Sequence, residues 1–279
     1  MTKNLGSLYI VATPIGNLND ITFRAIEILN KVDICASEDT RISRVLFKKY
    51  NINTQLTSYH KFSEKSKINT FIDILKSGKD IALISDAGTP LISDPGHFLV
   101  QAAIQNQIRI IPIPGVTSVI TALSVSGFSL ENFTYYGFFP RKSKDRKVLL
   151  KKIAMSSSPS VLFESGRRLE KLFDSLSEEL KPDCRILVAR ELTKLHETLY
   201  RSELYKMKDI LLDSEFGLKG EFVIIIDGHE EESGDILIEE EKRILGILME
   251  KLDRKLALQI ASDILKKKRN EIYKIKMKS

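Results

Sequence analysis

Apolar residues in the first half of the chain form short uninterrupted runs, each followed by a loop and a helical pattern. Runs without polar alternation predict strands buried on both faces, so the alternating order predicts a largely parallel sheet with crossover helices. Asn19 and Asp20 are placed to cap the first helix, which carries Ile21, Ala25 and Leu29. The four predicted strands are residues 8–11, 32–36, 81–84 and 108–113.

The pattern changes after Pro140, where strand-like runs follow one another with fewer helices between them. Apolar residues between 169 and 180 still recur at helical spacing. The runs at 160–164, 185–191, 197–201 and 221–227 predict a mixed second sheet. We therefore expect an α/β domain at residues 1–124, a second at 125–228, and a ligand cleft between them.

Residues 229–279 differ from the rest in both charge and pattern. Acidic residues at 229–235 and 239–241 predict a linker, and apolar positions from 244 to 264 predict a small helical module. The chain carries a net charge of +6, and residues 242–279 hold 12 basic and 4 acidic residues. The predicted tail therefore holds the basic excess.

A second basic segment lies at residues 141–152, where seven of 12 residues are Lys or Arg, directly after an aromatic run at 135–140. A single basic segment is compatible with an ordinary solvated loop or helix face. Two basic segments favour a polyanionic partner such as RNA. The candidate RNA-binding residues are Arg141, Lys142, Lys144, Arg146, Lys147, Lys267, Lys268 and Arg269.

Composition argues against membrane, secreted, disulfide-rich and metal-binding proteins. Hydrophobic residues make up 43% of the chain, yet no run approaches the roughly 18 apolar residues of a membrane helix. The first residues lack the plan of a signal peptide, so we expect a cytoplasmic protein with no membrane segment. Cys35 and Cys184 lie far apart in apolar segments and are expected to be buried free thiols. No residue spacing specifies a metal or a nucleophilic triad.

Three loops after first-half strands are rich in Gly, Pro and small hydroxyls: residues 12–17, 85–96 and 112–118. None is a dinucleotide fingerprint or a Walker loop. Each alone is compatible with a tight turn, but ligands bind at the carboxyl ends of parallel strands, where all three fall. Together they favour a small-molecule site.

Ionisable groups also crowd residues 190–197, immediately after a predicted strand, and include Arg190, Glu191, Lys194 and His196. A connection needs fewer charges than this, although ordinary surface charge remains an alternative. Residues 36–41 end another strand with Glu38, Asp39 and Arg41, where bracing of the loop by an ion pair is as reasonable as substrate contact. His60 is a lone histidine, for which a structural role is the commoner one.

At these residues the sequence resembles the ribosomal RNA methyltransferases of the tetrapyrrole methylase family. The resemblance spans nearly the whole chain and includes a C-terminal helical module. It implies two α/β domains with S-adenosylmethionine in the cleft between them, a homodimer, and methylation of the ribose 2′-oxygen of a decoding-centre cytidine in 16S rRNA. The matching segments are residues 8–22, 36–41, 85–96, 114–115, 189–197 and 219–221.

Carried over by position, the resemblance also implies which residues contact the cofactor. Two of its motifs depart from the family pattern: Phe62 and Ser63 follow His60 in place of histidine and asparagine, and Gly166 and Arg167 stand in place of proline and histidine. These departures do not fall on the cofactor loops. The implied cofactor contacts are Ile15, Gly16, Ala87, Gly88, Leu91, Thr117, Ser118, Phe163, Arg190 and Glu221.

The implied reaction is attack by a ribose hydroxyl oxygen on the methyl carbon of a sulfonium, which needs alignment and an acceptor for the hydroxyl proton. Glu191 is the candidate base, with Lys194 and His196 as rivals. Two other functions stay open. A methylase of a tetrapyrrole or protein acceptor would not need two basic segments, and a non-catalytic rRNA-binding assembly factor would not need the crowded segment 190–197.

Overall fold

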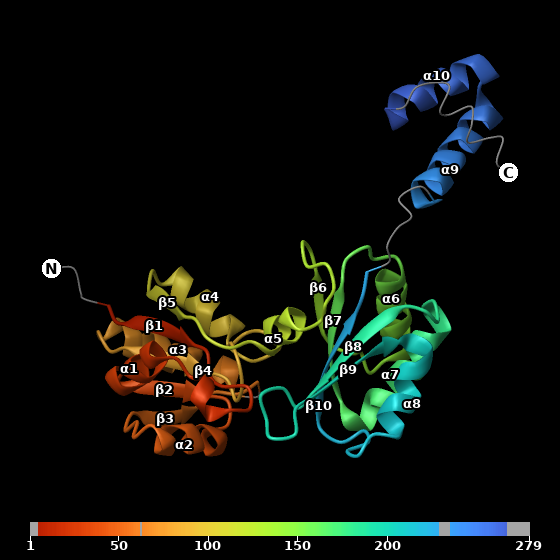
Figure 1. The fold of residues 1–279 in the computed structure, drawn as a ribbon. Coiled ribbons are helices and arrows are strands. Elements are labelled where there is room, and N and C mark those ends of the chain that lie inside the picture. Colours follow the sequence, from red (N-terminus) through yellow and green to blue (C-terminus); the bar gives the residue numbers. More distant parts are fainter. Residues whose placement is uncertain (1–4, 62, 229–234, 267–279) are drawn as a thin grey trace. The chain divides into compact units, whose positions relative to one another are not determined.

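The computed structural model describes residues 5–61, 63–228 and 235–266. For residues 235–240 it describes the backbone only. The chain divides into two compact units, residues 1–227 and 228–279, and each is described by itself (Figure 1). The expected division at residue 124 stays a prediction.

The first unit opens with a five-stranded sheet in the order β3-β2-β4-β1-β5, and every neighbouring pair is parallel. This confirms the predicted parallel sheet. The sequence analysis missed β3, because three of its four residues are polar and none is fully buried. The strands are β1 Ser7–Val11, β2 Ile34–Ser37, β3 Gln55–Ser58, β4 Ile81–Ile84 and β5 Arg109–Ile113.

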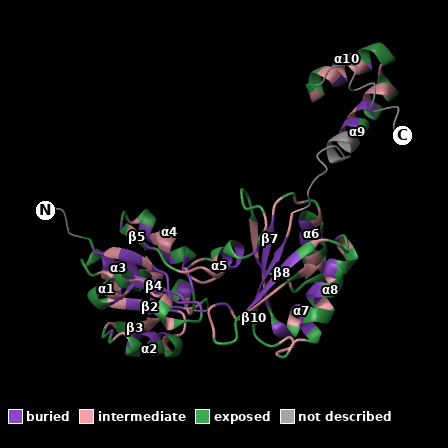
Figure 2. Cartoon of the chain, in the orientation of Figure 1, coloured by how far each residue is buried: buried purple, intermediate pink, exposed green. Residues whose placement is uncertain are grey.

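Helices cover both faces of this sheet, which is why its strands lack polar alternation. Tyr9 and Val11 of β1 pack with α1 and α2, whereas Leu8 packs with α3 and α4 on the opposite face. Figure 2 shows the buried residues gathered on the strands and on the inner sides of these helices. The helices are α1 Phe23–Lys31, α2 Thr40–Lys49, α3 Glu64–Lys76 and α4 His97–Gln105.

The cap predicted for α1 is wrong. Leu18–Asp20 form a short 3-10 helix, η1, so Asn19 and Asp20 lie inside that turn. The helix begins after Thr22, whose hydroxyl accepts a hydrogen bond from the Ala25 amide at 3.1 Å. A threonine at this position satisfies one of the amides that the first helical turn leaves without a partner.

The second sheet has the order β6-β7-β10-β8-β9. Only β6 and β7 are parallel, so the predicted mixed sheet is confirmed. Residues 135–138 of the aromatic run belong to β6, a strand that the sequence analysis did not predict. The strands are β6 Thr134–Phe138, β7 Ser160–Ser165, β8 Arg185–Arg190, β9 Thr198–Glu203 and β10 Glu221–Ile226.

Three helices, α6 Ser143–Ala154, α7 Gly166–Glu179 and α8 Leu204–Leu212, pack against one face of the second sheet. The opposite face packs against α5, Ser118–Ser124, through Val119, Ala122 and Leu123. Ile15, from the loop after β1, joins the same apolar cluster. The first-half segments that follow β1 and β5 therefore contact the second sheet.

The second unit contains α9, Asp235–Lys251, and α10, Arg254–Leu265, packed through Leu245 and Ala261. The helical module predicted from residues 244 to 264 is confirmed, and it consists of two helices. The acidic residues 239–241, predicted as linker, instead belong to α9, since glutamate is a good helix former and apolar residues surround the run. Lys267, Lys268 and Arg269 lie outside the described residues. Within the described part of the chain, no helix is long and apolar enough to span a membrane.

Candidate functional site

The three Gly- and Pro-rich loops meet at the carboxyl ends of β4, β1 and β5, which are neighbours in the first sheet. Thr13 and Gly88 form a β-bridge in which each amide donates to the other carbonyl at 2.9 Å. The Ala12 amide donates to the Ile113 carbonyl at 3.2 Å, and a side chain at Gly115 would collide with Ala12. Close backbone approach therefore explains both the bridge and the glycine.

The loop after β4 has an unusual backbone. Leu91 and Ser93 have positive φ values of 75° and 71°, which cost a non-glycine residue on the order of 1–3 kcal/mol each. Two contacts hold this loop. The buried Glu64 carboxylate accepts the Gly96 amide at 2.9 Å, and the Ser93 and Tyr135 hydroxyls lie 2.6 Å apart. The strained loop is thus tied both to α3 and to β6.

A cavity of about 480 Å³ lies beside these loops and takes part of its lining from the second sheet. The loops after β1, β2, β4 and β5 line it together with β7, β10 and the segment after β8. Its lining residues are Ile15, Glu38, Asp86, Ala87, Gly88, Thr89, Ile92, Ser93, Asp94, Thr117, Ser118, Phe138, Phe163, Glu164, Ser165, Ala189, Glu191, Leu192, Lys194, Glu221, Phe222 and Val223.

Most of the cofactor contacts expected from the sequence border this one cavity. Among the described residues, Gly16, Leu91 and Arg190 do not line it. The expected residues that do are Ile15, Ala87, Gly88, Thr117, Ser118, Phe163 and Glu221.

Gly16 and Leu91 instead support the walls of the cavity. A Cβ on Gly16 would lie 2.5 Å from Lys194 Cγ and 2.8 Å from the Leu192 carbonyl oxygen. Leu91 packs into the apolar cluster beneath the sheet edge and borders Gly96. Gly16 therefore allows the segment after β8 to approach the loop after β1.

Arg190 is buried and is not among the residues that line the cavity. Its Nε donates to the Lys219 carbonyl at 2.7 Å and its Nη1 to the His196 carbonyl at 2.9 Å. The guanidinium also lies 4.4 Å from the centre of the Phe216 ring. Arg190 thus fixes the two segments that flank the cavity from the second sheet.

Of the three candidate bases, Glu191 and Lys194 line the cavity and form an ion pair. Lys194 Nζ lies 3.0 Å from Glu191 Oε1 and 2.9 Å from Glu221 Oε2, and the Glu221 amide also donates to Glu191 Oε1 at 2.8 Å. His196 is exposed, stacks near Phe216 and lies outside the lining.

These contacts set the charge of both groups. Burial alone raises the pKa of Glu191, but hydrogen bonds from the Glu221 amide and Lys194 outweigh it, and the pKa is lowered. Burial alone lowers the pKa of Lys194, but its hydrogen bonds to Glu221 and Glu191 outweigh it, and the pKa is raised. Both groups therefore stay charged near neutral pH.

Besides Glu164 of β7, three carboxylates line the cavity that the sequence analysis did not assign to the site: Glu38, Asp86 and Asp94. Burial, with the nearby charges of Asp94, Asp86 and Asp39, raises the pKa of Glu38 to about 7. Burial likewise raises the pKa of Asp94 to about 6, against a hydrogen bond from Ser85. They come from loops after two neighbouring parallel strands, β2 and β4, which brings them to one edge.

The two departures from the family pattern have structural roles in the residues described. The Ser63 amide and hydroxyl both contact His60, closing the turn before α3, and Phe62 lies outside the described residues. A Cβ on Gly166 would lie 1.7 Å from the Leu218 carbonyl oxygen, so no larger residue fits without a backbone shift. Arg167 is exposed.

The basic segment 141–147 surrounds the start of α6, directly after β6. Lys142 is its N-cap residue, and Lys144, Arg146 and Lys147 follow within the first turns. The positive end of the helix dipole disfavours cations here. Among the described residues none of these side chains has an ion-pair partner. The arrangement is unfavourable for stability and favourable for binding an anion.

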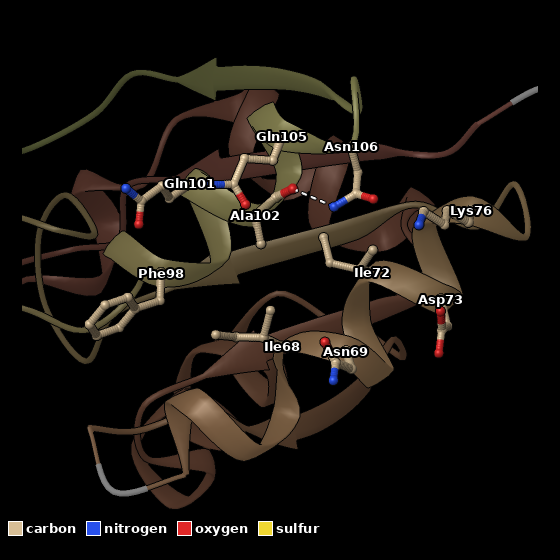
Figure 3. Close-up of a pocket in the computed structure, with 10 residues that line it drawn as sticks. All are labelled: Ile68, Asn69, Ile72, Asp73, Lys76, Phe98, Gln101, Ala102, Gln105 and Asn106. Carbon is tan, nitrogen blue, oxygen red and sulfur yellow. Dashed lines mark hydrogen bonds between the residues drawn. The ribbon is translucent and has the colours of Figure 1, made fainter.

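A second groove, of about 530 Å³, lies between α3 and α4 (Figure 3). It is slightly larger than the loop cavity, but Asp73 and Lys76 are the only ionisable residues among the described ones that line it, and both lie on α3. Carboxamides and apolar side chains such as Phe98 make up the rest. We place the functional site at the loop cavity, because it gathers strained backbone and charged groups.

Known proteins are similar to this chain in sequence and in fold. Ribosomal RNA small subunit methyltransferase I of Escherichia coli O157:H7 is 40% identical over 269 residues, 96% of this chain and 94% of that protein. Its namesake from Haemophilus influenzae is 39% identical over 274 residues, 98% of this chain and 97% of that protein.

Solved structures agree on the fold. Cobalt precorrin-4 methyltransferase, a cobalamin biosynthetic enzyme, superposes with a TM-score of 0.60 at 18% identity, over 79% of this chain and 94% of that one. The model of the tetrapyrrole (corrin/porphyrin) methylases matches residues 7–208. With this match and relatives at about 40% identity over nearly its whole length, the chain belongs to the tetrapyrrole methylase family.

Proposed function

We propose that this chain uses S-adenosylmethionine to methylate the ribose 2′-oxygen of cytidine 1402 in the 16S RNA of the small ribosomal subunit. The observation that carries the proposal is the meeting of three strand-end loops and the segment after β8 around one charged cavity. The acceptor is inferred from the relatives that are named as small subunit rRNA methyltransferases.

The cavity suits a cationic methyl donor. Six carboxylates and one amine line it, so its walls are strongly acidic. Phe138 and Phe163 add aromatic faces, with ring centres 5.6 Å apart. Anionic and aromatic surroundings both stabilise a sulfonium. We assign Ile15, Ala87, Gly88, Thr117, Ser118, Phe163 and Glu221 as cofactor contacts, with Gly16, Leu91 and Arg190 supporting them.

When bound, the cofactor supplies an activated methyl group, and the protein supplies alignment and water exclusion. Because an incipient alkoxide approaches a cation, charge is neutralised in the reaction, so positioning matters more than an oxyanion hole. Lys194, held by two carboxylates, fixes the segment after β8 at the cavity wall. Thr193 joins that segment to the loop after β1.

The start of α6 provides a surface for the RNA. Phe138 lines the cavity and is 58% exposed, so it can stack on an unpaired base beside the methyl donor. The basic residues start at Arg141, three residues after Phe138. The backbone amides at the N-terminal end of α6 also favour binding of phosphate. We assign Arg141, Lys142, Lys144, Arg146 and Lys147 to phosphate contacts; the tail residues Lys267, Lys268 and Arg269 complete the proposed set.

A homodimer in the cytoplasm, beside assembling ribosomal subunits, is the remaining part of the proposal. Phe23 and Leu195 are 93% and 92% exposed, and a second copy of the chain would cover such apolar side chains. Sedimentation equilibrium tests this directly. A monomer mass that does not change with concentration would contradict the proposed dimer and leave the proposed reaction standing.

The test of the reaction is transfer of labelled methyl groups from S-adenosylmethionine to small subunits that lack the modification, followed by alkaline hydrolysis. A methylated 2′-oxygen cannot assist strand cleavage, so the label is expected in an alkali-resistant dinucleotide. Label in mononucleotides would indicate base methylation instead. Cofactor binding without any label in RNA would favour a tetrapyrrole or protein acceptor, or a non-catalytic assembly role.

A further inference from the structure

The six carboxylates that line the cavity differ in what their oxygens contact. Glu38 is one of them that has no hydrogen bond or ion pair with any described residue. Asp86 accepts the Asp39 amide at 2.8 Å and Glu164 accepts the Ser165 amide at 2.8 Å, whereas the nearby Ser85 hydroxyl lowers the pKa of Asp94 against the effect of burial. A carboxylate without a donor keeps its lone pairs available for a ligand.

Glu191 and Glu221, the two carboxylates that pair with Lys194, are both engaged. Glu191 accepts two hydrogen bonds through one oxygen, from Lys194 and from the Glu221 amide. Glu221 pairs with Lys194 through its own carboxylate. Because a paired carboxylate with a lowered pKa is a weaker base, Glu191 is less suited to take a proton than the sequence alone indicates.

Local structure keeps Glu38 at the cavity wall and keeps cations away from it. It follows β2 directly, and the hydrogen bond from the Asp39 amide to Asp86 fixes the backbone beside it. Arg41 is the cation of this loop, but it forms a two-pronged pair with Asp39 and its side chain is 85% exposed. No cation of the same loop therefore neutralises Glu38.

The groups that face Glu38 are acidic on its own side of the cavity. Asp39 belongs to its loop, Asp86 and Asp94 to the loop after β4. The charged pair of Glu191 and Lys194, with Glu221, faces the cavity from the second sheet. Burial and these negative neighbours raise the pKa of Glu38 to about 7, close to the value that serves a base at neutral pH.

We propose that Glu38 is the general base that takes the proton of the acceptor hydroxyl during methyl transfer. The inference rests on the proposed function. The hydroxyl oxygen forms a bond to the methyl carbon, the carbon–sulfur bond breaks with its electron pair left on sulfur, and the proton passes to the Glu38 carboxylate. Glu191 then holds Lys194 and the Glu221 backbone in place.

The test compares the full-length wild-type protein with the Glu38→Gln, Glu38→Asp and Glu191→Gln variants. Binding of S-adenosylmethionine is measured by calorimetry, and single-turnover methyl transfer to unmodified small subunits is measured from pH 5.5 to pH 9. We expect the wild-type rate to rise with pH through about 7. Glu38→Gln should keep its cofactor affinity within about threefold and lose about 100-fold or more in rate, with no inflection near neutral pH.

Glu38→Asp should recover part of the rate, since it restores a carboxylate one methylene shorter. Glu191→Gln should weaken cofactor binding and keep the inflection. Retention of wild-type rate and pH profile by Glu38→Gln would overturn the assignment of Glu38 and leave the proposed function standing. Failure of the wild-type protein to label RNA would overturn both, and thermal melting of each variant shows that it is folded.

Discussion

The Asn17 amide donates a hydrogen bond of 3.1 Å to the Thr193 hydroxyl, across 176 residues of sequence. This bond joins the loop after β1 of the first sheet to the segment after β8 of the second. Gly16, next to Asn17, leaves the space that the contact needs, since a Cβ there would meet the Leu192 carbonyl oxygen at 2.8 Å. The cavity wall depends on this approach.

We therefore expect Gly16→Ala to weaken S-adenosylmethionine binding by about tenfold or more, equivalent to about 1.4 kcal/mol, by pushing the segment of Leu192 and Lys194 outward. Calorimetric titration measures the loss. Gly246→Ala on α9 is the matched control, because no heavy atom lies within 4 Å of its added methyl group. Equal affinities for the two variants would show that the contact does not shape the site.

The parallel sheet could be predicted from the sequence because β1, β2 and β4 are buried on both faces and therefore lack polar alternation. The same rule placed the three loops at one sheet edge. It failed for β3, a polar edge strand, and for the cap of α1, since no pattern separates a 3-10 turn at 18–20 from the first turn of a helix. Local propensity decides little at such positions.

Part of the candidate site could not be predicted from the sequence. Glu38 and Asp94 belong to different strand ends and become neighbours only because β2 and β4 pair in the sheet. Arg190 was expected at the cofactor because its motif matches the family. Its direction is instead set by the Lys219 carbonyl and the Phe216 ring, which come from the segment before β10. Side-chain direction follows tertiary contacts that spacing does not reveal.

Arg190→Lys is expected to lower the free energy of unfolding by about 2–4 kcal/mol. Lysine cannot supply both donors in the fixed geometry that meets the Lys219 and His196 carbonyls, so a buried carbonyl loses its partner. Urea unfolding provides the measurement. Arg24→Lys, at an exposed position of α1, should change it by less than about 0.5 kcal/mol. A similar small change at Arg190 would contradict the bracing role.

The cations at the start of α6 should bind RNA phosphates. Replacing Lys144 and Lys147 together by alanine should weaken RNA binding and reduce the slope of log affinity against log salt by about 1.5, because each lost phosphate contact removes about 0.7–0.9. Filter binding over a series of salt concentrations measures both. The double change of Lys48 and Lys49, exposed at the end of α2, is the control with equal loss of charge. Equal slopes for both variants would show that the basic segment is only a solvated face that makes no phosphate contacts.

The acidic cavity should also make the cofactor-free protein less stable at high pH. The pKa of Glu38 is raised to about 7 and that of Asp94 to about 6, from ordinary values of 4.5 and 3.8. The folded state therefore binds more protons than the unfolded state in this window. The stability contributed by the protonated carboxyls is fully present below the unfolded pKa values and is lost as pH rises through about 7.

Glu38→Gln removes one of these titrations and should raise the melting temperature of the cofactor-free protein at pH 8 by about 2 °C, with a smaller rise at pH 5.5. Scanning calorimetry at both pH values measures the difference. Glu27→Gln makes the same change of charge at an exposed position of α1, where it should leave the pH dependence unaltered. If Glu38→Gln and Glu27→Gln shift the melting temperature equally at pH 8, net charge rather than the crowding of carboxylates in the cavity governs the effect. A larger shift at Glu38 would place the destabilisation in the cavity itself, where binding of a cation relieves it.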